Sequence, residues 1–101
     1  MEIMDTIAAI STASQESAIS MVRISGTDAI QIADILFSKS VKDQQSHTMQ
    51  YGFIKDPHTN AIVDEVFLTL FRAPKTYTTE DIVEINCHGG IVVTQRILAL
   101  V

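Results

Sequence analysis

The sequence lacks tryptophan and contains one cysteine, two prolines and only 6% aromatic residues. The lone thiol, Cys87, has no partner for an internal disulfide, which is typical of proteins from a reducing compartment. With so few aromatics, the hydrophobic residues, 47% of the chain, are mainly Ile, Val, Leu and Ala. This content of β-branched residues favours a fold that contains a sheet.

Basic residues are also scarce, because the chain has 7 Lys and Arg, scattered along it, against 12 Asp and Glu. Binding to nucleic acid or to an anionic membrane surface requires clustered positive charge, so we expect neither from this chain by itself. No apolar run approaches the roughly 18 residues of a membrane helix. The start Met1–Asp5 is acidic, unlike that of a signal peptide. We therefore expect a cytoplasmic protein.

Sequence motifs for nucleotide hydrolysis and metal binding are absent. A phosphate loop has the pattern G-x-x-x-x-G-K-[ST], and none of the four glycines precedes a lysine. The His and Cys residues show no zinc-binding spacing. We therefore predict no metal site and no catalytic residue, and we expect that this chain is not catalytic alone.

Hydrophobic periodicity predicts five strands and two helices in one small domain. The strands are expected at Thr6–Thr12, Ala18–Ser25, His47–Ile54, Ala61–Arg72 and Asp81–His88, and the helices at Thr27–Phe37 and Ile91–Val101. The first two strands should form a hairpin, and so should the third and fourth. Together these elements predict an α+β fold with a small mixed sheet of about five strands, packed with two or more helices.

Three local features refine this expectation. Thr27 is the predicted N-cap of the first helix, and Gly52 either weakens its strand or marks a bulge. The helix Ile91–Val101 is apolar almost all round, which predicts burial. The sequence stops without a helix-capping signal, so we expect that it is cut within this helix and that native residues follow Val101.

The strand Asp81–His88 has an unusual polar face made of Glu84, Asn86 and His88. An ordinary solvent-facing side of a strand explains this row as well as a binding site does. The functional interpretation, one wall of a small-molecule site, gains support from Gly89 and Gly90. Glycines allow a ligand close to the backbone, and the amides of the following helix attract carboxylate or phosphate.

Arg23 stands in an otherwise apolar strand, and three explanations are open. The strand can be an edge strand with Arg23 in water, Arg23 can pair internally with Glu84, or it can recognise a ligand. Cys87 and His88 are adjacent in a strand and point to opposite faces, so they cannot form a catalytic pair. Cys87 is therefore predicted to be a small core residue.

Four stretches, in order and at the expected spacing, resemble the N-terminal domain of one family. They are Asp5–Thr12, Val22–Gly26, Arg72–Thr78 and Glu80–Gly90. The resemblance runs from about Met4 to Val101, and the family is the MnmE (TrmE) family of tRNA-modifying GTPases. No single stretch is specific, but the combination is.

The resemblance implies a fold similar to the folate-binding domain of glycine-cleavage aminomethyltransferases. It also implies a homodimer that binds 5-formyltetrahydrofolate or a related tetrahydrofolate. The folate-contacting Arg and Glu of the family fall on Arg23 and Glu84, and Asn86, His88, Gly89 and Gly90 are weaker candidates. A third family contact, a lysine, lies in a stretch that this sequence lacks, so the site is expected to be incomplete.

For the full-length parent, the resemblance implies a helical domain and a GTPase domain that uses GTP, magnesium and potassium. With the flavoprotein MnmG (GidA), the parent would modify the wobble uridine of certain tRNAs. Residues 1–101 would be the N-terminal folate-binding and dimerisation domain, truncated at its C-terminal end, without those other domains. Two alternatives are a stand-alone aminomethyltransferase-like enzyme, with His88 as its local acid or base, and a purely structural dimerisation module.

Overall fold

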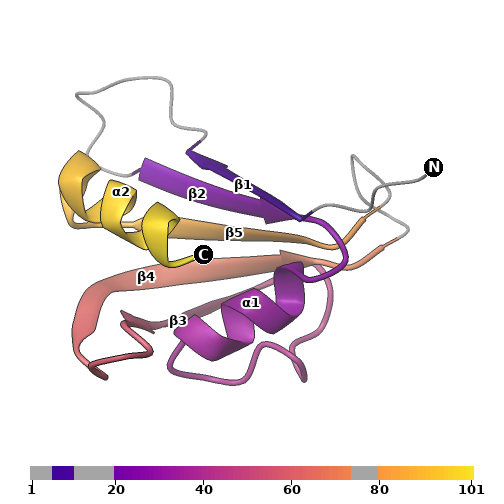
Figure 1. The fold of residues 1–101 in the computed structure, drawn as a ribbon. Helices are drawn as coiled ribbons and strands as arrows, with labels where there is room; N and C mark the ends of the chain where they lie inside the picture. The colour runs from indigo at the N-terminus through magenta and orange to yellow at the C-terminus, as the bar shows by residue number, and fades with distance from the viewer. Residues whose placement is uncertain (1–5, 11–19, 74–79) are drawn as a thin grey trace.

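A computed structural model describes residues 6–10, 20–73 and 80–101 of the chain (Figure 1). Within these ranges all five predicted strands and both predicted helices are present, with ends that differ by a few residues from the sequence prediction. The elements in chain order are β1 (Ile7–Ile10), β2 (Ser20–Ser25), α1 (Ala29–Leu36), β3 (Thr48–Lys55), β4 (Ile62–Phe71), β5 (Ile82–Cys87) and α2 (Gly90–Leu100).

The strands form one sheet in the order β1-β2-β5-β4-β3. As predicted, β1 pairs with β2 and β3 pairs with β4; residues 11–19, which join β1 to β2, lie outside the described part. The prediction of a mixed sheet is wrong, because every pairing among the described strands is antiparallel. The reason is that α1 leads the chain to the far edge, and β5 then returns through the centre, antiparallel to both neighbours.

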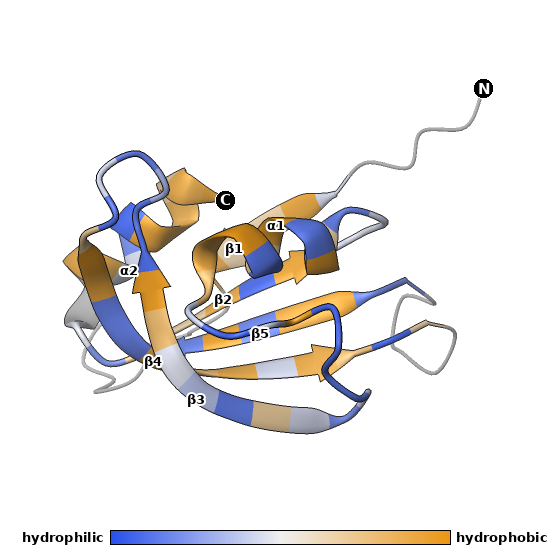
Figure 2. Cartoon of the chain, turned by 90° about the horizontal axis from the view of Figure 1, so that it is seen from below, coloured by the Kyte–Doolittle hydropathy of each residue, from blue (hydrophilic) through white to orange (hydrophobic). Residues whose placement is uncertain are grey.

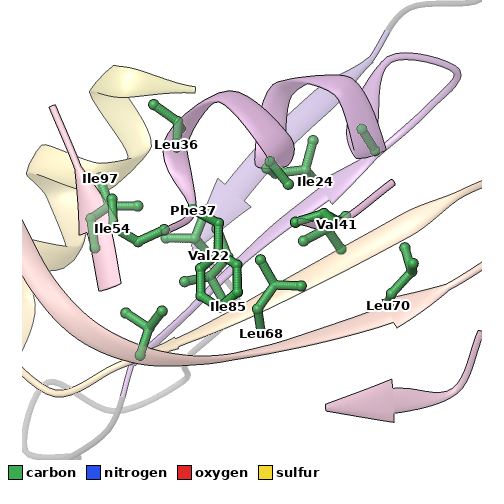
Figure 3. Close-up of a cluster of buried hydrophobic side chains, with 14 of the residues drawn as sticks. Val22, Ile24, Leu36, Phe37, Val41, Ile54, Leu68, Leu70, Ile85 and Ile97 are labelled. Carbon is green, nitrogen blue, oxygen red and sulfur yellow. The ribbon is translucent and has the colours of Figure 1, made fainter. Parts of the chain in front are cut away.

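Both helices cover the same face of the sheet and enclose one hydrophobic core (Figures 1 and 3). Strand residues alternate between this face and the opposite one, so hydropathy changes from residue to residue along the strands (Figure 2). The fully buried strand residues are Val22, Ile24, Ile54, Val66, Leu68, Leu70, Val83, Ile85 and Cys87. The predicted α+β fold class is confirmed.

The N-cap of the first helix lies one residue later than the sequence predicts. Its N-cap is Asp28 rather than Thr27, and no side chain caps it. Instead, the Asp28 backbone N–H donates to Thr6 Oγ1 at 3.0 Å. A residue distant in sequence therefore accepts one of the N–H groups that have no partner within the helix.

Gly52 stands in β3 where the chain after α1 passes over the strand. A Cβ at this position would lie 2.6 Å from the Phe37 ring, and Phe37 forms an isolated bridge with Ile54. The register irregularity of β3 lies between Ile54 and Lys55, not at Gly52. The glycine therefore permits close packing of Phe37 against the strand.

The prediction that α2 is buried all round is wrong. Thr94 and Ile97 are fully buried, whereas Val92 is 74% exposed and Arg96 lies on the exposed side. The helix lies on one face of the sheet, mainly over β1 and β2. Only the side of α2 that faces the strands is therefore covered by the described residues.

Candidate functional site

The face of the sheet opposite the helices contains the candidate binding residues. Neither helix covers it (Figure 1), and we call it the open face. Strand register places its members side by side across all five strands. They are Ile7, Ala9, Met21, Arg23, Ser25, Met49, Tyr51, Phe53, Glu65, Phe67, Thr69, Phe71, Ile82, Glu84 and Asn86.

An ion pair between Arg23 and Glu84 lies near the centre of the open face. The two residues face each other across β2 and β5, and Arg23 Nε and Nη2 donate to Glu84 Oε2 at 3.0 and 2.5 Å. The side chains are 38% and 17% exposed. Of the three explanations for Arg23, the edge strand is wrong, because β2 lies between β1 and β5; the internal pair is present.

This pair combines a hydrogen-bond acceptor and a donor group on rigid interior strands. An ionised carboxylate can accept two parallel N–H bonds, and a guanidinium presents five N–H donors in a plane. Thr69 faces Glu84 from β4, so a small side chain stands beside the carboxylate. The arrangement suits a planar ligand that offers adjacent N–H groups and a carbonyl oxygen.

The other residues of the predicted polar row lie farther along β5. Asn86 is partly buried and faces Phe67 across the β4–β5 pairing. His88 is exposed just beyond the strand, its ring 6.0 Å from that of Phe67 and its Nδ1 3.1 Å from the Glu65 carbonyl oxygen. The row therefore leads from the ion pair towards an aromatic group of residues.

Asp64 anchors the turn that begins α2 and was not among the predicted site residues. Its Oδ2 accepts the backbone N–H groups of His88 at 2.7 Å and Gly89 at 3.0 Å. These two amides immediately precede α2 and are bonded to a carboxylate of the protein itself. A Cβ at Gly89 would lie 2.7 Å from the Val93 side chain, so this glycine also permits close packing.

An aromatic patch, which we define as Tyr51, Phe53 and Phe67, occupies the β3–β4 part of the open face. The Tyr51 ring centroid lies 5.8 Å from that of Phe53 and 5.4 Å from that of Phe67. The Tyr51 hydroxyl donates to Glu65 Oε2 at 2.8 Å, which raises the pKa of Tyr51. The alternation Met49-x-Tyr51-x-Phe53 was the sequence signal that could have revealed this patch.

Cys87 is a core residue, as predicted. Its side chain is fully buried, and its Sγ lies 3.5 Å from the Ile85 carbonyl oxygen. Burial raises the pKa of the Cys87 thiol to about 11. The thiol is therefore protonated at neutral pH and faces away from the open face, so it cannot act as a nucleophile there.

Residues 6–10, 20–73 and 80–101 contain no group of three or more His, Cys, Asp or Glu side chains placed to hold a metal ion. In the same ranges, no helix combines the length and the apolar character needed to cross a membrane.

The fold and the site define the class of protein: a small α+β domain with one helix-covered sheet face and one open face that bears a charged pair. The chain belongs to the family described as the GTP-binding protein TrmE N-terminus, which matches residues 6–101. The resemblance stated from the four sequence stretches is thereby confirmed.

Curated relatives agree with this family. The tRNA modification GTPase MnmE of Geobacillus thermodenitrificans is 56% identical over 101 residues, which cover 96% of this chain and 22% of the relative. Those of Lysinibacillus sphaericus and Staphylococcus haemolyticus are 55% and 53% identical and are covered over 22% and 21% of their lengths. The chain thus spans about a fifth of the length of these relatives.

Proposed function

We propose that this domain binds 5-formyltetrahydrofolate or a related tetrahydrofolate and forms a homodimer within a tRNA modification GTPase. The main support for ligand binding is the Arg23–Glu84 pair on the two interior strands of the open face. Both residues stand where the family resemblance puts its folate contacts. They are partly exposed, so a ligand can reach them.

The chemistry of a pterin matches this pair. A pterin edge presents a ring N–H beside an amino group. The carboxylate of Glu84 can accept both in parallel if Arg23 gives up one of its two bonds to Oε2, which then serves the ligand. The guanidinium of Arg23 can donate to the pterin carbonyl or to a carboxylate of the ligand. Asn86, His88 and the turn at Gly89 and Gly90 would extend the site along β5 and its end.

Dimerisation is supported by β1, an edge strand of the described sheet. It has four apolar residues and no charge, and Ile7 is 65% exposed. An uncharged edge offers unpaired backbone groups to another chain, and a small domain gains stability from added burial. We expect that Ile7→Glu shifts the full-length protein from dimer to monomer in light scattering; an unchanged dimer would place the contact elsewhere.

The activity proposed for the full-length parent is the one that its relatives are named for. We infer that the full-length protein hydrolyses GTP with magnesium and potassium in a domain beyond this chain, and that it acts in the cytoplasm. Its partners would be the flavoprotein MnmG (GidA) and tRNA, with the wobble uridine as the modified base. The names of the relatives, tRNA modification GTPases, support the GTP hydrolysis and the action on tRNA. The metals, the flavoprotein partner and the wobble uridine are what the family resemblance implies.

Calorimetry on the full-length protein tests the folate site. We expect that Glu84→Gln weakens 5-formyltetrahydrofolate binding by about 10- to 100-fold, because a hydrogen bond to a charged group contributes about 1.5–3 kcal/mol. Asp43→Asn is the matched control, since it removes an exposed carboxylate far from the pair and should leave affinity unchanged. Circular dichroism checks that both variants are folded.

A purely structural dimerisation module is the second candidate, favoured by the same apolar edge strand. Wild-type protein that is dimeric but gives no heat with the folate would support this candidate. Equal affinity of wild type and Glu84→Gln would instead remove Glu84 from the site.

A further inference from the structure

His88 is exposed at the end of β5, and yet three contacts with β4 hold it in place. Asp64 Oδ2 accepts the His88 backbone N–H at 2.7 Å. The imidazole Nδ1 lies 3.1 Å from the Glu65 carbonyl oxygen, and the ring centroid lies 6.0 Å from that of Phe67. Fixing a side chain costs conformational entropy, and in an exposed residue little burial offsets that cost.

The contact with Glu65 determines which nitrogen of the His88 ring carries the proton. A carbonyl oxygen can only accept a hydrogen bond, so Nδ1 must be the donor and must carry a hydrogen. In the neutral imidazole, Nε2 then has no hydrogen and presents a lone pair. Because His88 is exposed and follows Glu84 and Asn86 on the open face, a molecule bound on that face can reach this lone pair.

These contacts remain possible when the His88 imidazole takes up a proton. Nδ1 donates in both the neutral and the charged ring, and Asp64 holds the backbone rather than the ring. Nε2 can therefore gain and lose a proton without displacing the ring. The ionisable groups beside it are Asp64 and Glu65 on β4 and Tyr51 on β3, whose hydroxyl donates to Glu65; the first turn of α2 has no acidic residue.

His47 is bonded in the opposite sense. Ser46 Oγ accepts the Arg72 backbone N–H at 2.9 Å, so the Ser46 hydroxyl can direct its own hydrogen to His47 Nδ1, 2.7 Å away. The lone pair of His47 is therefore on Nδ1 and is used within the protein. The tautomer of His88 instead directs its lone pair away from β4.

We propose that His88 is a proton acceptor in the reaction of the bound folate, with its tautomer set by β4. This inference rests on the proposed folate function. Nε2 takes a proton from an N–H or O–H group of the bound reactants. The electron pair of the broken bond stays on the reactant atom, and the imidazolium returns the proton to water.

The position of His88 on the open face suits this role. A pterin bonded to Glu84 by its N–H edge carries the one-carbon unit on its other ring, away from the carboxylate. His88 lies four residues beyond Glu84, which is roughly 13 Å along the strand direction. When the ligand lies along β5, its one-carbon unit is therefore between the two residues.

The test compares wild type, His88→Asn and His58→Asn as full-length proteins with the flavoprotein partner. An asparagine amide can still donate to the Glu65 carbonyl oxygen, but it cannot take up a proton. Single-turnover tRNA modification is measured between about pH 5 and 8, where imidazoles titrate. We expect His88→Asn to be about 100-fold slower than wild type at pH 8. The difference should shrink as the pH falls, because the wild-type imidazole becomes protonated.

His58→Asn is the matched control, because it makes the same change in the exposed turn between β3 and β4. It should modify tRNA at the wild-type rate. Calorimetry should show wild-type folate affinity in both variants, and circular dichroism checks that they are folded. His88→Gln is a second variant with the same expected loss, and added imidazole should restore part of the rate of His88→Ala.

Two results would overturn the role of His88. One is a His88→Asn protein that modifies tRNA at the wild-type rate at pH 8. The other is a loss of rate that is the same at every pH, which would show that His88 acts by contact and not by proton transfer. If the wild type does not bind the folate, the proposed function itself fails. If it binds the folate and His88→Asn is unimpaired, the proton acceptor alone is refuted.

Discussion

The two faces of the sheet are built from the same strands but differ in almost every property. On β4, Val66, Leu68 and Leu70 are fully buried under the helices, whereas Phe67 between them is 37% exposed. On β5, Ile85 is fully buried, whereas the side chain of Glu84 is 17% exposed. One step along a strand therefore separates a residue that stabilises the fold from one that is available to a ligand.

The two faces of the sheet therefore have different roles in this small domain. The helix-covered face consists mainly of aliphatic residues, whose burial drives folding. The open face has a specific arrangement of one ion pair and one aromatic patch, which packing of the described residues does not require. Substitutions on the two faces should therefore separate stability from ligand binding.

The largest effect is expected for Leu68→Ala on the helix-covered face. Removing a fully buried leucine side chain leaves a cavity and should lower the free energy of unfolding by about 2–5 kcal/mol. Its neighbour Phe67→Ala should cost less, about 1–2 kcal/mol, because that ring is already 37% exposed. Urea denaturation measures both; similar losses would mean that the open face also stabilises the domain.

Gly52→Ala should have a smaller effect on the same face. The new methyl group would lie 2.6 Å from the Phe37 ring, so the ring or the strand must move. Overpacking of this kind costs about 1–3 kcal/mol. Thermal denaturation measures the stability of Gly52→Ala and of the double variant Gly52→Ala/Phe37→Leu. Restored stability in the double variant would identify this contact as the cause. No change in either variant would show that Phe37 moves freely.

The smallest effect concerns the thiol on the covered face. Because burial raises the pKa of Cys87 from 9.0 to about 11, the unfolded chain loses this proton first as the pH rises. Stability is therefore unaffected below pH about 9 and falls through pH 11. At pH 10 the loss should be about 1 kcal/mol relative to pH 8. To check this, the free energy of unfolding of wild type and of Cys87→Ala is measured at pH 8 and at pH 10. The variant has no thiol, so it should lack the loss that the Cys87 thiol causes in the wild type.

Much of the fold was predictable from sequence because it depends on periodicity. The alternation along Asp81–His88 separated a polar face from the face of Cys87 and predicted Cys87 as a core residue, and its burial confirms this. The spacing of Ala29, Ala33 and Leu36 likewise predicted α1. These patterns are local, so they need no knowledge of which strands are neighbours.

Other features were missed because they depend on long-range contacts. Strand direction depends on the path of the whole chain, so the mixed sheet was a wrong prediction. Val92 is apolar but lies on the exposed side of α2. Its hydrophobicity therefore contributed to the wrong prediction that the helix is buried all round. Asp64 and Phe67 gave no local signal, because the residues they contact lie about 20 positions away in sequence.

The candidate site shows the same division. Sequence alone singled out Arg23 as a charge in an otherwise apolar strand and Glu84 as part of a polar row, and the family resemblance implied a role for both. The sequence could not decide whether Arg23 lies in water, pairs internally with Glu84 or contacts a ligand. Only the register of β2 against β5 brought the two side chains together across 61 positions.

Local periodicity and motif order in the sequence were therefore enough to predict the elements, the two faces of β5 and the family. The tertiary structure decided the antiparallel order of the strands, the internal ion pair and the position of Phe67 beside it. The physical reason is that hydrogen bonds between strands, unlike alternation within a strand, join residues that the chain order does not relate.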